Sequence, residues 1–253
     1  CMLEKITNKL KQEGFISTFL AIILFPIKVT KSRLEFYKML RTPSIKNRFE
    51  QIYKKNYWSS EESVSGEGSE IGYTKNLREW LILKLSDLNV KKIVDAPCGD
   101  FNWMKEVIPK LEVTYQGLDI VDSVIETNKS LYESADVKFS VADICADTLP
   151  DCDLLIARDF LFHLSYEHID MFLENLSNTD YKYLLTTSHI IEDGYLNKDI
   201  ATGSFRLIDL FSSPFNFNPE SVVDKIKDYP QGYKIPREMI LIEKRNVPVS
   251  LSL

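Results

Sequence analysis

The feature that most constrains the fold is a regular alternation of strand-like and helix-like segments between residues 90 and 188. Short runs rich in Val, Ile and Leu are separated by longer segments whose apolar residues recur every three or four positions. Such alternation indicates a parallel sheet joined by right-handed crossovers, with helices on both faces. The sequence therefore predicts an α/β fold with a doubly wound, mostly parallel sheet. The expected strands are 92–95, 113–119, 137–143, 153–157 and 183–188, and the expected helices are 103–111, 123–133 and 167–176.

The segments on either side of this core are less regular. A helix is expected near 74–85, and residues 205–210 fit either a strand or a short helix. A helix is expected at 219–227 and a strand at 238–244. These patterns divide the chain into an N-terminal helical arm, a main domain that begins with a loop, and a C-terminal tail. Their ranges are 1–57 for the arm, 58–244 for the main domain, 58–73 for its first loop and 245–253 for the tail.

The arm differs from the rest of the chain in charge. It holds twelve Lys and Arg against four Glu, a net of +8, so the remainder carries −14 because the whole chain carries −6. The acidic main domain argues against a nucleic-acid partner. An apolar run at 15–27 is 13 residues long, whereas a membrane-spanning helix needs about 20. Two interpretations stay open: a helix that packs on the domain or on a second copy, and peripheral attachment to an anionic membrane.

Cysteine usage bears on the compartment. The four cysteines are scattered, and none forms a Cys-x-x-Cys pair that would indicate a zinc site. Unpaired cysteines in a chain of this size are typical of a reducing environment. The sequence therefore predicts a cytoplasmic protein, at the inner face of the membrane if the arm attaches there.

The loop before the first expected strand is rich in small residues. Residues 56–78 contain three glycines and five serines, which indicates irregular structure. One interpretation is a flexible linker between the arm and the core. The other is a lid over a ligand site, with Arg78 available to bind a carboxylate. We call residues 58–73 the lid loop.

Acidic residues follow three successive expected strands. Asp95 opens a turn that runs to Asp100, Asp119 ends the second strand, and Asp143 ends the third. The carboxyl ends of parallel strands meet at one edge of a sheet, so these side chains are expected to line one ligand site. Asp119 lies 24 residues after Asp95, a spacing at which a carboxylate can accept both hydroxyls of a ribose. Asp143 can accept a hydrogen bond from an adenine amino group.

The turn after the first strand discriminates between nucleotides. A dinucleotide site needs Gly-x-Gly-x-x-Gly so that the pyrophosphate can lie against the backbone, but this turn has only Gly99 and a bulky Phe101. A diphosphate would be repelled by Asp95 and Asp100, whereas a cofactor that carries an ammonium and a sulfonium would be attracted. The sequence therefore predicts S-adenosylmethionine as the ligand. Arg158, Asp159 and His163, after the fourth strand, are expected to face its reactive end.

These residues resemble the class I S-adenosylmethionine-dependent methyltransferases. The family's first motif, Asp/Glu-x-Gly-x-Gly-x-Gly, corresponds to residues 95–101, with Pro97 and Phe101 in place of two glycines. The sequence looks like a bacterial subgroup with Asp-x-Pro-Cys-Gly-Asp-Phe-Asn-Trp-Met. Its Ser-Gly-x-Gly-Ser loop corresponds to residues 65–69, and its Arg-Asp-x-Leu-Phe-His-Leu segment to residues 158–164.

The resemblance covers residues 49–244 and implies a Rossmann-like, seven-stranded sheet that carries out methyl transfer. Members are often met among genes for capsules and other surface polysaccharides. The resemblance therefore implies O-methylation of a saccharide, or of a phosphate or phosphoramidate group on one. The cofactor contacts that it implies are Ser65, Gly66, Arg78, Asp95, Ala96, Pro97, Gly99, Asp100, Trp103, Asp119, Ile120, Asp143, Ile144 and Arg158.

Catalysis on a hydroxyl calls for a general base, because a sugar hydroxyl is a weak nucleophile near neutral pH. The candidates are His163, His189 and Asp159. An acceptor that is already an oxyanion needs no base, and the histidines would then orient or neutralise it. Asp159 and His189 are also a candidate pair for a divalent metal that polarises the acceptor. Arg206 and Tyr195 are the candidate substrate-binding residues, within an expected acceptor side at 190–232.

Two other functions stay open at this point. One is a protein that binds S-adenosylmethionine as a scaffold without catalysis. The other is a nicotinamide-dependent oxidoreductase, against which the missing glycine fingerprint weighs.

Overall fold

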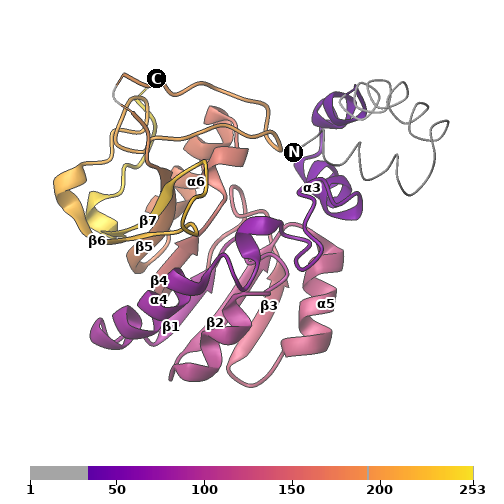
Figure 1. The fold of residues 1–253 in the computed structure, drawn as a ribbon. Helices are drawn as coiled ribbons and strands as arrows, with labels where there is room; N and C mark the ends of the chain where they lie inside the picture. The colour runs from indigo at the N-terminus through magenta and orange to yellow at the C-terminus, as the bar shows by residue number, and fades with distance from the viewer. Residues whose placement is uncertain (1–33, 193, 253) are drawn as a thin grey trace, which may run out of the picture. The chain divides into compact units, whose positions relative to one another are not determined.

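The computed structural model describes residues 34–192 and 194–252 (Figure 1). The chain divides into two compact units, residues 1–43 and 44–253. In the smaller unit, residues 34–40 are helical. The apolar run at 15–27 lies outside the described residues. The larger unit contains the sheet and also helix α3, Ile45–Lys54, which belongs to the range that the sequence assigned to the arm.

A seven-stranded sheet of order β3-β2-β1-β4-β5-β7-β6 forms the centre of the larger unit. The pairs among β1 to β5 are parallel, and β7 lies antiparallel between β5 and β6. This confirms the α/β, Rossmann-like, mostly parallel seven-stranded fold. The strands are β1 Lys92–Asp95, β2 Thr114–Asp119, β3 Val137–Val141, β4 Cys152–Ala157, β5 Tyr181–His189, β6 Val222–Lys227 and β7 Arg237–Glu243.

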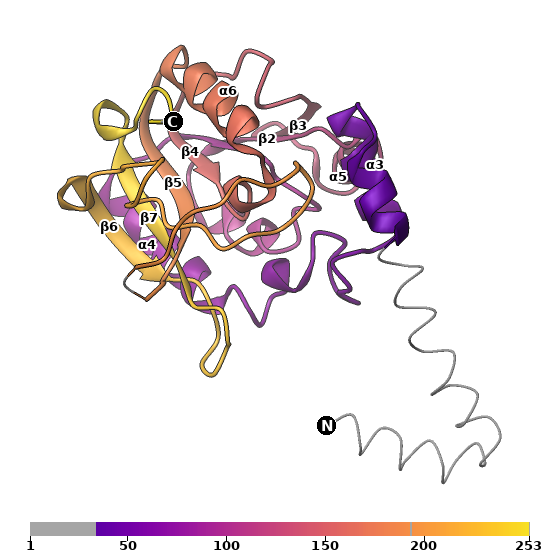
Figure 2. The ribbon, with the colours of Figure 1, turned by 90° about the horizontal axis from the view of Figure 1, so that it is seen from above.

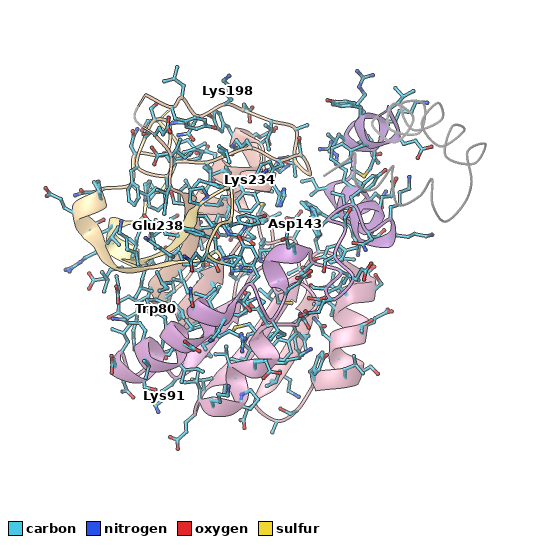
Figure 3. All side chains as sticks on the ribbon, viewed as in Figure 1. Trp80, Lys91, Asp143, Lys198, Lys234 and Glu238 are labelled. Atoms are coloured by element: carbon cyan, nitrogen blue, oxygen red, sulfur yellow. The ribbon has the colours of Figure 1, made fainter. Side chains whose placement is uncertain are left out.

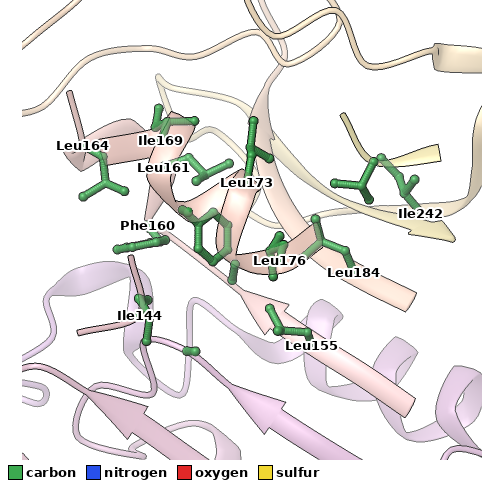
Figure 4. Close-up of a cluster of buried hydrophobic side chains, with 14 of the residues drawn as sticks. Ile144, Leu155, Phe160, Leu161, Leu164, Ile169, Leu173, Leu176, Leu184 and Ile242 are labelled. Carbon is green, nitrogen blue, oxygen red and sulfur yellow. The ribbon is translucent and has the colours of Figure 1, made fainter. Parts of the chain in front are cut away.

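Helices cover both faces of this sheet (Figures 1 and 2). Helix α6, Tyr166–Ser177, packs on one face, where its Leu176 lies in one cluster with the strand residues Leu155 and Leu184 (Figure 4). Helix α4, Lys75–Asp87, and helix α5, Asp122–Tyr132, pack on the other face around Ile93. Neighbouring strand residues alternate between the two clusters because successive side chains of a strand point to opposite faces. The double layer of helices is the reason that the central strands read as continuous apolar runs.

Three local predictions are wrong. Residues 103–111 form two short 3₁₀ turns rather than an α-helix, and Pro109 within them has no amide hydrogen to donate. Residues 219–227 form a 3₁₀ turn followed by strand β6, whose side chains alternate in burial as in an edge strand. Residues 205–210 are neither strand nor helix.

The C-terminal tail is attached to the main body. The Leu251 amide donates to Asp170 Oδ1 at 2.7 Å, and the Ser252 amide donates to the Pro214 carbonyl at 3.0 Å. Leu251 also packs against the apolar cluster under α6. Within the described part of the chain, no helix combines the length and apolarity that a membrane crossing requires.

Gly117 in β2 gives a test of the packing. A Cβ atom there would lie 2.7 Å from Phe139 Cδ1 and 3.0 Å from Cys98 Sγ. We expect Gly117→Ala to lower the free energy of unfolding by about 1–3 kcal/mol, as overpacking of a core does. Urea denaturation measures the change. Gly72→Ala is the matched control, because nothing lies within 4 Å of its added Cβ. Equal stability of the two variants would contradict the packing described here.

Candidate functional site

Two cavities lie at the carboxyl edge of the parallel strands, the larger of about 240 Å³ and the smaller of about 60 Å³. They share five lining residues, so they form one continuous site: Tyr53, Trp58, Pro97, Asp159 and His163. Asp143 marks this edge in Figure 3, and Lys91, before β1, marks the opposite edge. The site therefore lies where open α/β sheets bind their ligands.

The turn after β1 holds the floor of the larger cavity. Gly99 has a φ of 55°, and a Cβ atom at this residue would lie 2.3 Å from Ser65 Oγ. The site therefore requires a glycine for both conformation and space. The Gly99 amide donates to Asp119 Oδ2 at 3.1 Å, and its carbonyl accepts from Asn128 Nδ2 at 2.7 Å. The turn is thus fixed against both β2 and α5.

Two buried carboxylates lie beneath this turn. Tyr115 Oη donates to Asp95 Oδ2 at 2.7 Å, and Asp119 accepts from the Gly99 and Val121 amides. Burial raises the pKa of Asp95 to about 7 and the pKa of Asp119 to about 6. Neither has an ion-pair partner among the described residues. Such carboxylates favour a cationic or hydroxyl-bearing ligand over a phosphate.

The smaller cavity combines apolar walls with carboxylates. Asp119 and Asp143 line it, and the Cys145 amide donates to Asp143 Oδ1 at 3.1 Å. Its other walls come mainly from aromatic and aliphatic side chains. These include Phe49, Tyr53, Ile120, Ile144 and Phe160. A flat ring with a polar edge fits this set of groups.

The lid loop lies over the larger cavity and is bound to Asp100. Ser63 Oγ donates to Asp100 Oδ2 at 2.8 Å, the Val64 amide donates to the same oxygen at 3.0 Å, and Ser65 Oγ donates to Asp100 Oδ1 at 3.1 Å. The Asp100 amide in turn donates to Ser65 Oγ at 3.0 Å. Asp100 therefore anchors the loop. Ser65 and Gly66 line the cavity.

A buried cluster of four charges forms another wall. Arg158 Nε donates to Asp228 Oδ2 at 2.9 Å, and Arg237 Nη2 lies 2.8 Å from Asp159 Oδ2. Arg158 and Arg237 also lie against the rings of Trp103 and Tyr73. Burial opposes ionisation of Asp159, but the two guanidinium groups outweigh it and lower its pKa. We call Arg158, Asp159, Asp228 and Arg237 the four-charge cluster; its formal charge is balanced.

His163 lines both cavities and is packed among aromatic rings. Its ring centroid is 5.6 Å from that of Trp58 and 4.5 Å from that of Phe162. Its Nδ1 lies 2.7 Å from the Ser204 carbonyl oxygen. Because a carbonyl only accepts, Nδ1 must carry the proton, and Nε2 is then the basic atom of the neutral ring. Burial lowers the pKa of His163 below the usual histidine value, so the neutral form prevails at neutral pH.

Six of the predicted residues line neither cavity. Ala96 is fully buried, and Asp100 is bound to the lid loop. Arg78 donates to the Ile71 carbonyl, and Arg206 donates to the Leu164 carbonyl at 2.6 Å. Tyr195 Oη donates to the Leu207 carbonyl at 2.8 Å. His189 Nδ1 accepts from the Ile208 amide at 3.2 Å, and its ring lies behind Phe162. The other predicted residues line one or both of the cavities: Ser65, Gly66, Asp95, Pro97, Gly99, Trp103, Asp119, Ile120, Asp143, Ile144, Arg158, Asp159 and His163.

Sequence reasoning missed the contribution of α3 and its following turn. Phe49 and Tyr53 are four residues apart on α3 and both line the smaller cavity. This i, i+4 aromatic pair was the available signal, but the basic composition of residues 1–57 obscured it. Arg237 and Tyr233 were missed as well, because the segment before β7 shows no motif.

A metal site finds no support in the described residues. They contain no group of three His, Cys, Asp or Glu side chains that could hold a metal ion. The Asp159 carboxylate already lies within 3.4 Å of Arg158 Nη1 and 2.8 Å of Arg237 Nη2.

The fold matches solved methyltransferases at low sequence identity. The N-methyltransferase NodS from Bradyrhizobium japonicum WM9, in complex with S-adenosyl-L-homocysteine, has a TM-score of 0.54 and 11% identity, over 77% of this chain and 97% of that one. Magnesium protoporphyrin IX methyltransferase from Synechocystis PCC 6803, with S-adenosyl-L-homocysteine bound, has a TM-score of 0.52 and 11% identity. The match covers 76% of this chain and 93% of that one. The S-adenosylmethionine-dependent methyltransferase SibL has a TM-score of 0.51 and 12% identity, and the match covers 95% of this chain and 73% of that one.

These matches show that the larger unit has the class I methyltransferase fold. No protein-family model matches the sequence, and no curated protein matches it.

The raised pKa of Asp95 predicts how stability depends on pH. The folded state holds a proton on Asp95 up to about pH 7, because burial raises its pKa, whereas the unfolded state loses it near the ordinary aspartate pKa of 3.8. The folded state therefore binds more protons between these values, and stability falls as pH rises through this window. We expect wild type to lose about 2–4 kcal/mol relative to Asp95→Asn between pH 4 and pH 8. Urea denaturation across this range measures the difference, and parallel profiles would contradict the assignment.

Proposed function

We propose that this protein is an S-adenosylmethionine-dependent methyltransferase that transfers a methyl group to a hydroxyl oxygen. The observation that carries the proposal is the set of acidic side chains at the ends of β1, β2 and β3, which line one continuous site in a fold of this class. Asp95 and Asp119 form no ion pair with any residue that the structure describes, so a ligand that carries an ammonium group and ribose hydroxyls is the complement of this site.

Different residues bind the ribose, adenine and methionine parts of the cofactor. Asp119 is placed to accept from the ribose hydroxyls, and Asp143 from the adenine amino group at the end of the smaller cavity. Phe49, Tyr53 and Phe160 enclose the adenine ring. Asp95 and the turn through Gly99 face the methionine portion, and the lid loop excludes water above it.

When bound, the cofactor supplies an electrophilic methyl group on its sulfonium. The chain then has to hold an acceptor oxygen in line with the S–C bond and remove its proton. His163 is the residue placed for this, because it lines both cavities and its Nδ1 proton is held by the Ser204 carbonyl. Nε2 of His163 accepts the proton from the acceptor.

The acceptor that we propose is a hydroxyl of a saccharide, in the assembly of a surface polysaccharide. This rests on the sequence resemblance and on the aromatic side chains of Trp58 and Phe205 beside His163. A phosphate or phosphoramidate acceptor receives less support, because both guanidinium groups in the larger cavity are already paired with carboxylates of the chain. A comparison of neutral and phosphorylated glycans as acceptors separates the two classes.

The test of the function is direct. Incubation with S-adenosylmethionine and a set of glycan acceptors should form S-adenosylhomocysteine, detected by mass spectrometry together with the methylated product. A protein that binds the cofactor but methylates no acceptor would favour the scaffold alternative, and a protein that binds no S-adenosylhomocysteine would exclude both.

Asp119 provides the test of cofactor binding. We expect Asp119→Asn to weaken S-adenosylhomocysteine binding by about 10–100-fold. Asparagine has only one acceptor oxygen, so it cannot accept from the ribose hydroxyls and also from both the Gly99 and Val121 amides. Isothermal titration calorimetry measures the dissociation constant. Asp136→Asn is the control, since Asp136 is exposed and lines neither cavity. An unchanged dissociation constant in Asp119→Asn would place the nucleoside elsewhere.

His163 provides the test of catalysis. We expect His163→Ala to lower kcat by about 10²–10⁴-fold, the usual contribution of a general base, with little change in affinity for S-adenosylhomocysteine. Wild-type activity should fall as pH drops through a value below 6.5, because protonation of His163 removes the base.

The other two histidines serve as comparisons for this experiment. His189→Ala and His168→Ala should retain activity, because neither residue lines the two cavities. Loss of activity in His189→Ala with full activity in His163→Ala would reverse the assignment.

A further inference from the structure

The lid loop passes very close to the four-charge cluster. The Gly68 carbonyl oxygen accepts a hydrogen bond from Arg158 Nη2 at 2.6 Å. A Cβ atom on Gly68 would lie 2.7 Å from Asp159 Oδ2 and 2.8 Å from Arg237 Nη2. The loop can therefore rest on the cluster only because residue 68 lacks a side chain. This contact is separate from the one at Asp100, which binds residues 63–65.

Arg158 owes its orientation to Asp228. The Asp228 side chain is fully buried and accepts from Arg158 Nε at 2.9 Å and from Arg158 Nη2 at 3.1 Å. Two parallel bonds between a guanidinium and a carboxylate fix the plane of the guanidinium. Nη2 then points one donor at Asp228 and another at Gly68. Asp228 itself lines neither cavity.

Asp228 also links distant parts of the chain. It follows β6 in the connection to β7, and its amide donates to the Arg237 carbonyl at 3.0 Å. Its carbonyl accepts from Arg237 Nε at 3.1 Å. Asp228 is thus held at the end of the β6–β7 pair. It lies 160 positions after Gly68, to which Arg158 donates.

We propose that Asp228 is a positioning residue that keeps the lid loop closed over the larger cavity by orienting Arg158. The lid loop then has two anchors, Asp100 at its first half and Arg158 at its second. Without the Asp228 carboxylate, Arg158 is left with Asp159, 3.4 Å from its Nη1, as its charged partner. Turning toward that partner takes Nη2 away from Gly68. The consequence for cofactor retention rests on the function proposed above.

The experiment measures opening of the lid loop without any cofactor. Hydrogen–deuterium exchange of the full chain reports on the Gly66, Ser69 and Glu70 amides, which bond within the loop. We expect Asp228→Asn to speed exchange in the peptide that covers residues 64–70 by tenfold or more. Gly68→Ala should do the same through steric contact, with all four charges intact.

Two controls separate lid opening from a general loss of stability. Asp224→Asn changes a carboxylate in β6, the strand that precedes Asp228, where Asp224 pairs with Lys84, and should leave exchange in 64–70 unchanged. Leu173→Ala removes a buried side chain from the apolar cluster under α6 and so lowers the free energy of unfolding. It should leave local exchange in the lid loop unchanged. Equal loop exchange in Asp228→Asn and Asp224→Asn would overturn the proposal.

A variant at Arg158 covers the case in which Asp228→Asn does not fold. Arg158→Lys keeps the positive charge but cannot bond Asp228 in two places and reach Gly68 together. It should speed exchange in 64–70 as well, and unchanged exchange in a folded Arg158→Lys would also overturn the proposal.

The cofactor product gives the second readout. We expect S-adenosylhomocysteine to dissociate about tenfold faster from Asp228→Asn and from Gly68→Ala than from wild type and Asp224→Asn, measured by stopped-flow displacement. Faster loop exchange with unchanged dissociation would show that the lid does not retain the product and would overturn that part of the inference. A wild-type protein that binds no S-adenosylhomocysteine would refute the proposed function, while the exchange data would still decide the role of Asp228.

Discussion

The structure depends on how tightly the chain turns after β1. Within five residues this turn makes hydrogen bonds to β4, to β2 and to the lid loop. The Ala96 amide donates to the Ile156 carbonyl in β4 and the Cys98 amide to the Leu118 carbonyl in β2, both at 2.8 Å. The Gly99 amide then reaches Asp119, and Asp100 binds the lid loop. Because residue 99 has no side chain, the turn can approach Ser65 closely, and it links the sheet, Asp119 and the lid loop.

Charge is distributed unevenly around the resulting site. At the floor, Asp95 and Asp119 are buried with no ion pair to residues 34–192 or 194–252, and burial raises their pKa values. At the wall beside His163, two carboxylates and two guanidinium groups cancel one another. Burying unpaired carboxylates is costly unless a ligand compensates them. This charge distribution favours a cation at the floor and a neutral group at the wall. A sulfonium cofactor would supply the cation, and a hydroxyl acceptor would be the neutral group.

Sequence reasoning succeeded where local pattern and tertiary role coincide. The central strands β1 and β4 are buried almost throughout, so their apolar runs are visible in the sequence. Asp95, Asp119 and Asp143 follow from where the first three predicted strands end. It failed where tertiary contacts decide the conformation. The segment 222–227 has a pattern that suits either a helix or an edge strand, and its pairing with β7 selects the strand.

The sequence by itself determined the α/β class and the strand ends that carry the acids, and it predicted the kind of ligand that those acids would attract. These features depend on periodicity and on residue type, both of which are local properties. Only the tertiary structure decided that α3 contributes Phe49 and Tyr53, that His163 and not His189 faces the cavities, and that Asp228 binds Arg158. Each of these is a contact between segments far apart in the chain, and the direction of a side chain across such a distance is set by packing rather than by neighbouring residues.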